Sequence, residues 1–144
     1  MSTRSRIGFR QSDGSIRSIY CHHDGYLSWN GLKLHTFYPN FHMATELVKL
    51  GNISSLKDNI APLPGQLHTF DNPAPNVTVA YDRDRGETES DSRVDADVDT
   101  FLANNEEFAY LFEVGQWWVW CLNDNKPRKM NLAAALVADG MVPA

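Results

Sequence analysis

The stretch that decides the fold is residues 5–26, SRIGFRQSDGSIRSIYCHHDGY, which predicts a β-hairpin that runs into a polar loop. Its strands are expected at residues 5–10 and 16–21, where the side chains alternate in character. Asp13-Gly14 lies between the two runs, and Asp-Gly in that position is a strong signal for a two-residue type I′ turn. We therefore expect the chain to begin with a pair of antiparallel strands.

The two-residue turn also fixes which side chains face one another. It places Ile7 opposite Tyr20 on the face expected to look toward the core, and Arg10 opposite Arg17 on the other face. Two like charges directly opposite each other are unfavourable. We expect an acid from elsewhere in the chain or an anionic partner to compensate the two arginines, or their side chains to splay into water.

A second hairpin is predicted at residues 108–113 and 117–122, with its turn at Val114-Gly115. Apolar side chains occupy both faces of this strand pair. Such a pair is either the covered centre of a sheet or a sheet with an adhesive outer face.

Trp118 and Trp120 share one face of the second hairpin. We expect a short Ala- and Leu-rich helix at residues 131–138 to cover this face, because burying a Trp stabilises a fold by roughly 2–3 kcal/mol. The alternative is that the two tryptophans form part of a partner-binding surface.

Capping signals place the helices. Asn40 and Gly51 are suited to begin and end a helix between them. A second helix is expected to start between Asp95 and Asp99 and to run to about Asn105, with acids in its first turn that suit the helix dipole. Residues 52–60 are expected to add a short helical turn.

The middle of the chain is expected to be irregular. Four prolines exclude regular structure from residues 61–76, which predicts a long loop before a strand at 77–81. The charges of residues 82–85 alternate at strand period, and the acidic segment that follows is expected to be mobile to about residue 93.

These elements predict a single α+β domain. We expect about five mostly antiparallel strands, from two β-hairpins and the strand at 77–81, packed with two or three helices. Residues 1–126 are expected to form the core domain, and residues 127–144 a C-terminal helical extension packed on it.

Composition limits the class of protein. The 144 residues carry a net charge of −5, which argues against a general nucleic-acid binder. Two cysteines far apart in sequence do not make a disulfide framework, so we expect a reducing compartment. The chain shows neither a membrane span nor a signal peptide, and the expectation is a soluble intracellular protein that makes no membrane contact.

Cys21, His22, His23 and Asp24 are the most reactive cluster, and all four are metal-ligand types. Neighbours on a strand rarely point at one ion, and no spacing here matches a known zinc motif. The alternative is a strand end whose imidazoles bind backbone carbonyls. We predict no cofactor and favour a protein that is not an enzyme.

Two other surfaces are candidate binding sites. An anion, a nucleotide or a nucleic acid could be bound by five arginines if the strand at 77–81 lies beside the first hairpin; these are Arg6, Arg10, Arg17, Arg83 and Arg85. A partner protein could be bound by an acidic segment and the open tryptophan face; these residues are Asp95, Asp97, Asp99, Trp118 and Trp120.

Several blocks of the sequence, in order, carry a resemblance. They are Ser2-Thr3-Arg4-Ser5-Arg6-Ile7, Asp13-Gly14-Ser15-Ile16, Ser18-Ile19-Tyr20-Cys21-His22-His23-Asp24-Gly25-Tyr26, Leu50-Gly51-Asn52-Ile53-Ser54-Ser55-Leu56, Ala80-Tyr81-Asp82-Arg83-Asp84-Arg85-Gly86-Glu87 and Tyr110-Leu111-Phe112. Over residues 2–122 the chain resembles a family of small hypothetical proteins of tailed bacteriophages and prophages. Leu27 stands where that family commonly has Pro, and residues 127–144 look like an addition.

The resemblance brings no activity, but it implies a setting. Small accessory proteins of phages act in the infected bacterium, often by binding a host enzyme or a defence complex such as a CRISPR effector. We therefore expect a non-enzymatic factor that binds and modulates a host or defence-system protein in the cytoplasm of the bacterial host. The alternatives are a nucleic-acid or nucleotide binder, a minor virion component, and a small metal- or cysteine-dependent enzyme.

Overall fold

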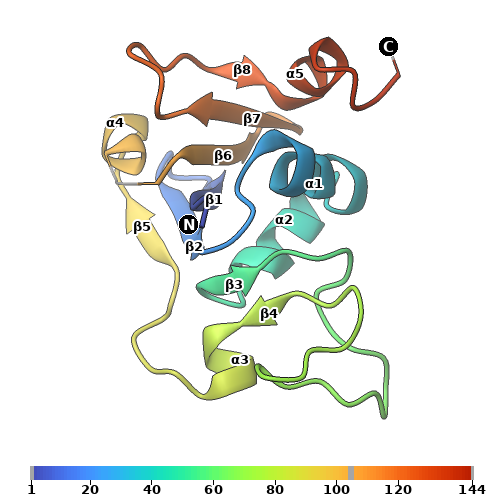
Figure 1. Ribbon diagram of the computed structural model, residues 1–144. Helices are drawn as coiled ribbons and strands as arrows, with labels where there is room; N and C mark the ends of the chain where they lie inside the picture. Colours follow the sequence, from blue (N-terminus) through green and yellow to red (C-terminus); the bar gives the residue numbers. More distant parts are fainter. Residues whose placement is uncertain (1, 104–105, 144) are drawn as a thin grey trace.

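The two hairpins of the sequence form the centre of one β-sheet, in a computed structural model that describes residues 2–103 and 106–143 (Figure 1). The first pairs β1 (Ser5–Arg10) with β2 (Ile16–Cys21), and the second pairs β6 (Phe108–Glu113) with β7 (Gln116–Cys121). β1 and β6 lie side by side and run parallel, so that both hairpin turns emerge at the same end of the sheet.

Four short strands extend this centre to eight strands among the described residues. They are β3 (Ile53–Ser55), β4 (Val79–Ala80), β5 (Arg93–Asp95) and β8 (Met130–Asn131). The order is β4-β3-β2-β1-β6-β7-β8, and β5 pairs with β2 beyond this path. The α+β class is confirmed. The sheet has more strands than expected and is mixed, because β1 with β6 and β2 with β3 are parallel.

Five α-helices and one π-helical turn accompany the sheet in the described part of the chain. They are the turn η1 (Leu27–Gly31), α1 (Leu32–Phe37), α2 (Phe41–Val48), α3 (Tyr81–Arg85), α4 (Val98–Leu102) and α5 (Leu132–Ala138). Side-chain caps define three of them: Asn40 accepts from Met43 N, Asp97 from Thr100 N and Asn131 from Ala134 N.

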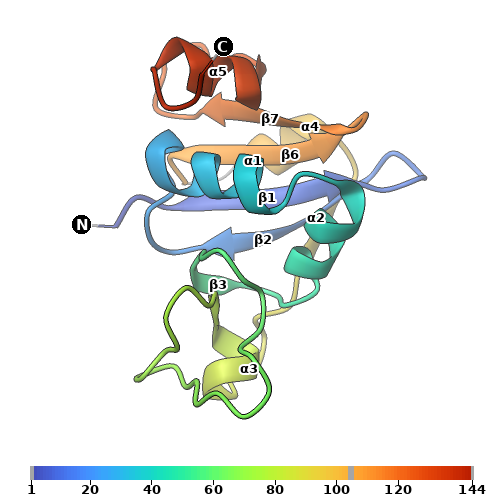
Figure 2. The same cartoon turned by 90° about the vertical axis from the view of Figure 1, so that its right-hand side faces the viewer.

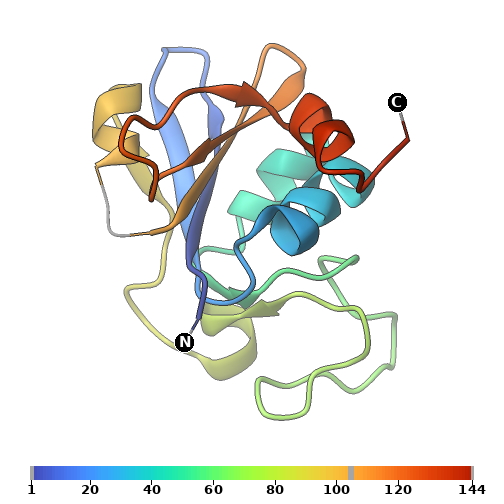
Figure 3. The same ribbon diagram turned by 45° about the horizontal axis from the view of Figure 1, so that its top comes forward.

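The sheet carries a core on each face. On one face, α1, α2 and α5 bury Ile7, Ile19, Tyr110 and Val119 in the main core (Figures 2 and 3). On the other face, α4 covers a smaller core (Figure 3), formed by Ile16, Phe101, Ala109, Leu111 and Trp120.

The expected register of the first hairpin is wrong by one residue. Ile7 pairs with Ile19 and Arg10 with Ile16, because the loop holds three residues instead of two. Gln11 N donates to Ser15 O, and Gly14 adopts a φ of 90° that places the extra residue. A turn followed by a left-handed glycine is the next commonest hairpin loop after the two-residue types. The consequence is that Arg10 and Arg17 lie on opposite faces and do not repel each other.

Two further local predictions are wrong. Residues 53–55 form β3 instead of a helical turn, because they pair with β2 and β4. Residues 82–85 belong to α3 instead of an extended strand exit, and Gly86 ends that helix with a φ of 68°. The short helical segment also means that Asp82 and Asp84 do not share one side at strand spacing.

The cover of the tryptophan face comes from an unexpected element. The ring of Phe101 on α4 lies 6.4 Å from that of Trp120, which is only 5% exposed. The C-terminal helix packs instead on the opposite face, where Leu132 and Leu136 are fully buried in the main core. The helix expected from Asp95 starts later: Asp95 is on β5, Asp97 is the cap, and residues 104–105 lie outside the described residues.

Candidate functional site

The reactive cluster near the end of β2 is engaged within the protein. Cys21 is fully buried; its thiol donates to His23 O at 3.4 Å and accepts from Asn30 Nδ2 at 3.3 Å. Burial raises the pKa of Cys21 to about 11, against the opposing effect of the hydrogen bond from Asn30. A thiol with a raised pKa is neutral at pH 7 and a poor nucleophile.

The side chains that follow Cys21 also have local partners. His22 Nδ1 bonds the Tyr20 hydroxyl at 2.7 Å, and burial lowers the pKa of His22. His23 Nδ1 bonds Ser2 Oγ at 3.0 Å, and Asp24 accepts from the Tyr26 hydroxyl at 2.9 Å. In residues 2–103 and 106–143, no group of three or more His, Cys, Asp or Glu side chains is placed to hold a metal ion.

The five candidate arginines are not gathered into one surface. Arg6 and Arg10 lie on one face of the sheet and Arg17 on the other, whereas Arg83 and Arg85 belong to α3 beyond β3. Four of them have anionic partners: Arg6 with Glu106, Arg10 with Glu113, Arg83 with Asp84 and Arg85 with Glu87. Arg17 instead bonds Gln11 and Ser92.

The acidic and tryptophan candidates are divided as well. Asp95 is 6% exposed and bound to Arg93, and Asp97 caps α4, so both have structural partners. Asp99 is exposed on α4. Trp120 belongs to the smaller core, and the half-buried Trp118 lies under Lys129 Nζ at 4.5 Å from its ring centre.

A buried polar clamp holds the proline-rich loop. His68 Nε2 lies 3.0 Å from Asp84 Oδ2, and Ala74 N donates to His68 Nδ1 at 2.9 Å. The acceptor role of Nδ1 places the proton of a neutral ring on Nε2, so His68 donates to Asp84. Arg83 adds bonds to Thr78 O and to Ile60 O. The charged residues expected to bind a ligand here therefore fix the loop to α3.

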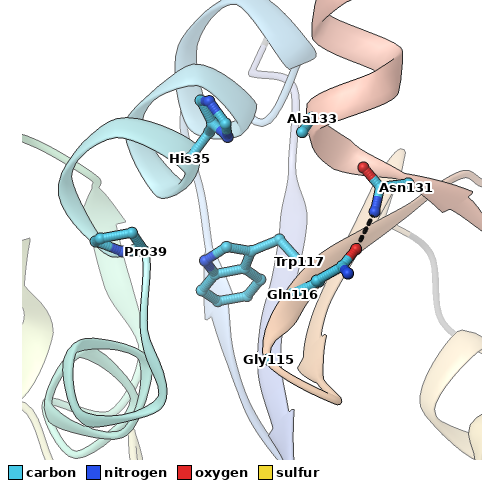
Figure 4. A pocket seen from close by; sticks show the side chains of 7 residues that line it. All are labelled: His35, Pro39, Gly115, Gln116, Trp117, Asn131 and Ala133. Carbon is cyan, nitrogen blue, oxygen red and sulfur yellow. Dashed lines mark hydrogen bonds between the residues drawn. The ribbon is translucent and has the colours of Figure 1, made fainter.

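Two adjacent hollows lie at the end of the sheet where the β6–β7 turn emerges. The first, of about 220 Å³, holds the Trp117 ring between Pro39 and the hydrogen-bonded pair Gln116–Asn131 (Figure 4). His35 lies above that ring in the same view, and no other described residue hydrogen-bonds its imidazole.

The second hollow, of about 390 Å³, shares Pro39 and Gly115 with the first. We call the two together the turn-end groove. Its lining is formed by Arg10, His35, Pro39, Asn40, Phe41, Phe112, Glu113, Val114, Gly115, Gln116, Trp117, Asn131 and Ala133.

A row of aromatic rings forms the apolar part of the groove. The Phe41 ring lies 6.5 Å from that of Phe112, which in turn lies 5.3 Å from Trp117. Phe112 and Trp117 are buried, whereas Phe41 is 53% exposed. An aromatic ring half-exposed in a row of buried rings offers a contact site to an apolar group.

One acid and two bases form the charged rim of the groove. Glu113 is held by Arg10 at 3.0 Å and by Lys129. Burial by itself would raise the pKa of Glu113, but the hydrogen bonds from Lys129 and Arg10 outweigh it and lower the pKa. The rim therefore keeps one excess positive charge when Glu113 is ionised.

Val114 breaks a local rule at the tip of the groove. It occupies the first position of the two-residue β6–β7 turn with a φ of 52°, and its side chain is 89% exposed. A β-branched residue in this region is strained, and Asn, Asp or Gly is the usual choice. The sequence signal was visible as Val where Asn is expected before Gly115, but the turn prediction did not use it.

No protein-family model, curated protein or solved structure matches this chain.

Among the described residues, no helix has the length and apolar character needed to cross a membrane.

Proposed function

We propose that the protein is a non-catalytic binding protein that takes a segment of a partner protein into the turn-end groove. The segment would place an apolar side chain against Phe41 and a carboxylate beside Arg10 and Lys129. The resemblance to phage proteins supports a host or defence-system protein as the partner.

The observation that carries this proposal is the strained and exposed conformation of Val114. Its φ of 52° costs about 1–2 kcal/mol relative to a residue suited to that region. With 89% of its surface exposed, the side chain recovers little of that cost from packing within the protein. Strain of this kind collects at binding and catalytic sites, where the exposed group is needed for another purpose. A valine that makes its contacts with a partner accounts for both features.

The charges around the groove favour an acidic segment. The whole chain carries −5, which would repel such a segment at long range. The rim, by contrast, sets Arg10 and Lys129 against Glu113 alone. A partner carboxylate beside the two bases would complete the charge balance, and complementary charges raise association rates and select the partner.

A crosslinking experiment can identify the partner. A photoreactive phenylalanine analogue replaces Phe41 in the full chain, which is crosslinked in a bacterial lysate, and the captured protein is identified by mass spectrometry. The purified partner is then titrated against wild type, Val114→Asp and Phe41→Ala. We expect both variants to lose roughly tenfold or more in affinity, or about 1.4 kcal/mol.

Leu67→Asp is the matched control. Leu67 is also 89% exposed, but it lies in the proline-rich loop and does not line the groove. Its affinity should stay within about twofold of wild type, since surface residues outside an interface contribute little. A captured protein that binds Val114→Asp and Phe41→Ala as tightly as wild type would contradict the proposal.

A further inference from the structure

Arg17 is a cation on the helix-covered face of the sheet. It pairs with Phe9 on β1 and with Val94 on β5, and Phe9 lies in the main core beneath α2. Within residues 2–103 and 106–143, no carboxylate lies within 4.0 Å of the Arg17 guanidinium. Its two partners are neutral oxygens, Gln11 Oε1 at 3.2 Å and Ser92 Oγ at 2.9 Å. A half-buried charge without a counter-ion is unusual, because burial favours pairing.

A third hollow, of about 420 Å³, lies beside this arginine. It is lined by Phe9, Arg17, Thr45, Val48, Lys49 and Ser92, and it shares no lining residue with the turn-end groove. Phe9 and Val48 are buried and give it an apolar floor. Arg17 and Lys49 give it two cations on different elements.

The walls of this hollow are fixed by the surrounding backbone. Ser92 lies directly before β5, which pairs with β2 through Ser18–Arg93 and its neighbours. The same segment is tied to the loop between α2 and β3 by Asn52 N, which donates to Ser90 O at 2.6 Å. A Cβ on Gly51 would come within 2.4 Å of Ser90 O, so the close approach requires glycine there. A site with fixed walls loses little entropy when it binds.

Donors remain available on both sides of the hollow. A guanidinium carries five N–H donors, and Arg17 uses two in the bonds to Gln11 and Ser92. Ser92 Oγ accepts from Arg17, which leaves its own hydroxyl proton free to donate. Lys49 is 72% exposed and bound to Glu46 at 3.2 Å, and an exposed pair of this kind exchanges partners at little cost. Thr45 donates to His42 O, so it can only accept.

We propose that this hollow binds the phosphate group of a small phosphorylated molecule. Arg17, Ser92 and Lys49 would hold the phosphate, and the organic part would lie against Phe9 and Val48. Two cations balance the charge of a phosphate dianion better than they balance that of a single carboxylate. The planar guanidinium also fits two phosphate oxygens at once. The site is separate from the turn-end groove, so the inference does not depend on the proposed function.

Titration with three probes tests the proposal. Adenosine monophosphate, inorganic phosphate and adenosine are each titrated into the full chain by calorimetry and by NMR. We expect adenosine monophosphate to bind with a Kd on the order of 1 mM or tighter, and each of the other two to bind at least roughly tenfold more weakly. The amide shifts should centre on Thr45, Lys49 and Ser92.

Variants separate this site from general surface charge. Arg17→Gln should lower the affinity for adenosine monophosphate by roughly tenfold or more, and Lys49→Gln should lower it by about threefold. Lys126→Gln removes an exposed cation outside the hollow and should leave the affinity unchanged.

Three results would overturn the proposal. Adenosine that binds as tightly as adenosine monophosphate would show that the phosphate is not recognised. If inorganic phosphate binds as tightly as adenosine monophosphate, the organic part contributes nothing to binding. Equal losses in Lys49→Gln and Lys126→Gln, with thermal stability unchanged, would show that the effect is general charge, even if Arg17→Gln fails to fold.

Discussion

At the end of the sheet where β1 begins, Cys21, Gly25, Asn30 and Tyr110 are buried against one another, and we call this the buried end. The Tyr110 hydroxyl donates to Gly25 O at 2.6 Å, and Asn30 Nδ2 donates to Ser5 and Cys21. At the opposite end, where β1 stops, the turn-end groove leaves Phe41 half-exposed and Val114 almost fully exposed. The contrast concerns residue types. Thiol, amide and phenol groups mark the buried end, whereas valine and phenylalanine mark the groove.

The difference shows that reactive residue types are a poor guide to a site. A Cβ on Gly25 would lie 2.9 Å from Ser5 Cβ and from Thr3 O, so the buried end is packed to its limit. Among its described polar side-chain atoms, Asn30 Oδ1 is buried without a hydrogen-bond partner. The groove has space, strain and unmatched charge. These are properties of an arrangement, and no single residue displays them.

Matched aromatic truncations give the largest expected effect. Tyr110→Ala should lower the free energy of unfolding by about 3–5 kcal/mol, because Tyr110 is fully buried and fills the main core. Phe41→Ala should lower it by only about 1 kcal/mol, since the ring is half-exposed. Urea unfolding followed by circular dichroism measures both. Similar losses in the two variants would remove the distinction between the two ends.

Alkaline pH should weaken the buried end through Cys21. The pKa of Cys21 is raised from 9.0 to about 11 in the folded protein, so the unfolded chain releases its proton first. The buried neutral thiol therefore contributes about 2–3 kcal/mol to the free energy of unfolding. This contribution is complete below pH 9 and is lost between pH 9 and about 11. Unfolding across this range should show a steeper fall for wild type than for Cys21→Ala, and parallel slopes would be inconsistent with a buried neutral thiol.

Relieving the strain at the groove should stabilise the protein. Val114→Asn places a residue that tolerates positive φ before Gly115 and should raise the free energy of unfolding by about 1 kcal/mol. Leu67→Asn is the control, because Leu67 is equally exposed but does not have a positive φ. Thermal unfolding compares the two. A Val114→Asn variant no more stable than Leu67→Asn would mean that Val114 stores no strain.

The ions of the groove should give the smallest effect. The pKa of Glu113 is lowered in the folded protein, so its contribution is present above the unfolded pKa near 4.5 and is lost as the pH falls through the folded value. At pH 7 the free energy of unfolding of wild type should exceed that of Glu113→Gln by about 1 kcal/mol or less, and this difference should vanish toward pH 3. Unfolding at pH 7, 5 and 3 checks this, and a difference independent of pH would exclude the ionised carboxylate as its source.

Local signals in the sequence were sufficient for several elements. Both hairpins, the helix cap at Asn40 and the approximate starts of the helices near Asp97 and at Asn131 depend on residues within a few positions of one another, and the α+β class follows from these elements. Backbone hydrogen bonds over such distances are governed by φ preferences and by capping side chains, which are properties of the residue types. The arginines grouped into one candidate site by residue type alone lie instead on both faces of the sheet and on α3.

Tertiary structure decided what local signals leave open. Gly14, in the left-handed region, adds one residue to the first loop and shifts the register of β1 and β2 by one residue. Relative to β1, every side chain of β2 therefore lies on the face of the sheet opposite to the expected one. The parallel pairing of β1 with β6 joins residues about a hundred positions apart, and it brings both hairpin turns to one end. Burial of Cys21, exposure of Phe41 and the lack of a counter-ion at Arg17 among the described residues follow from that packing. They depend on contacts between distant segments, which the free energy of the whole fold selects and which no short stretch of sequence specifies.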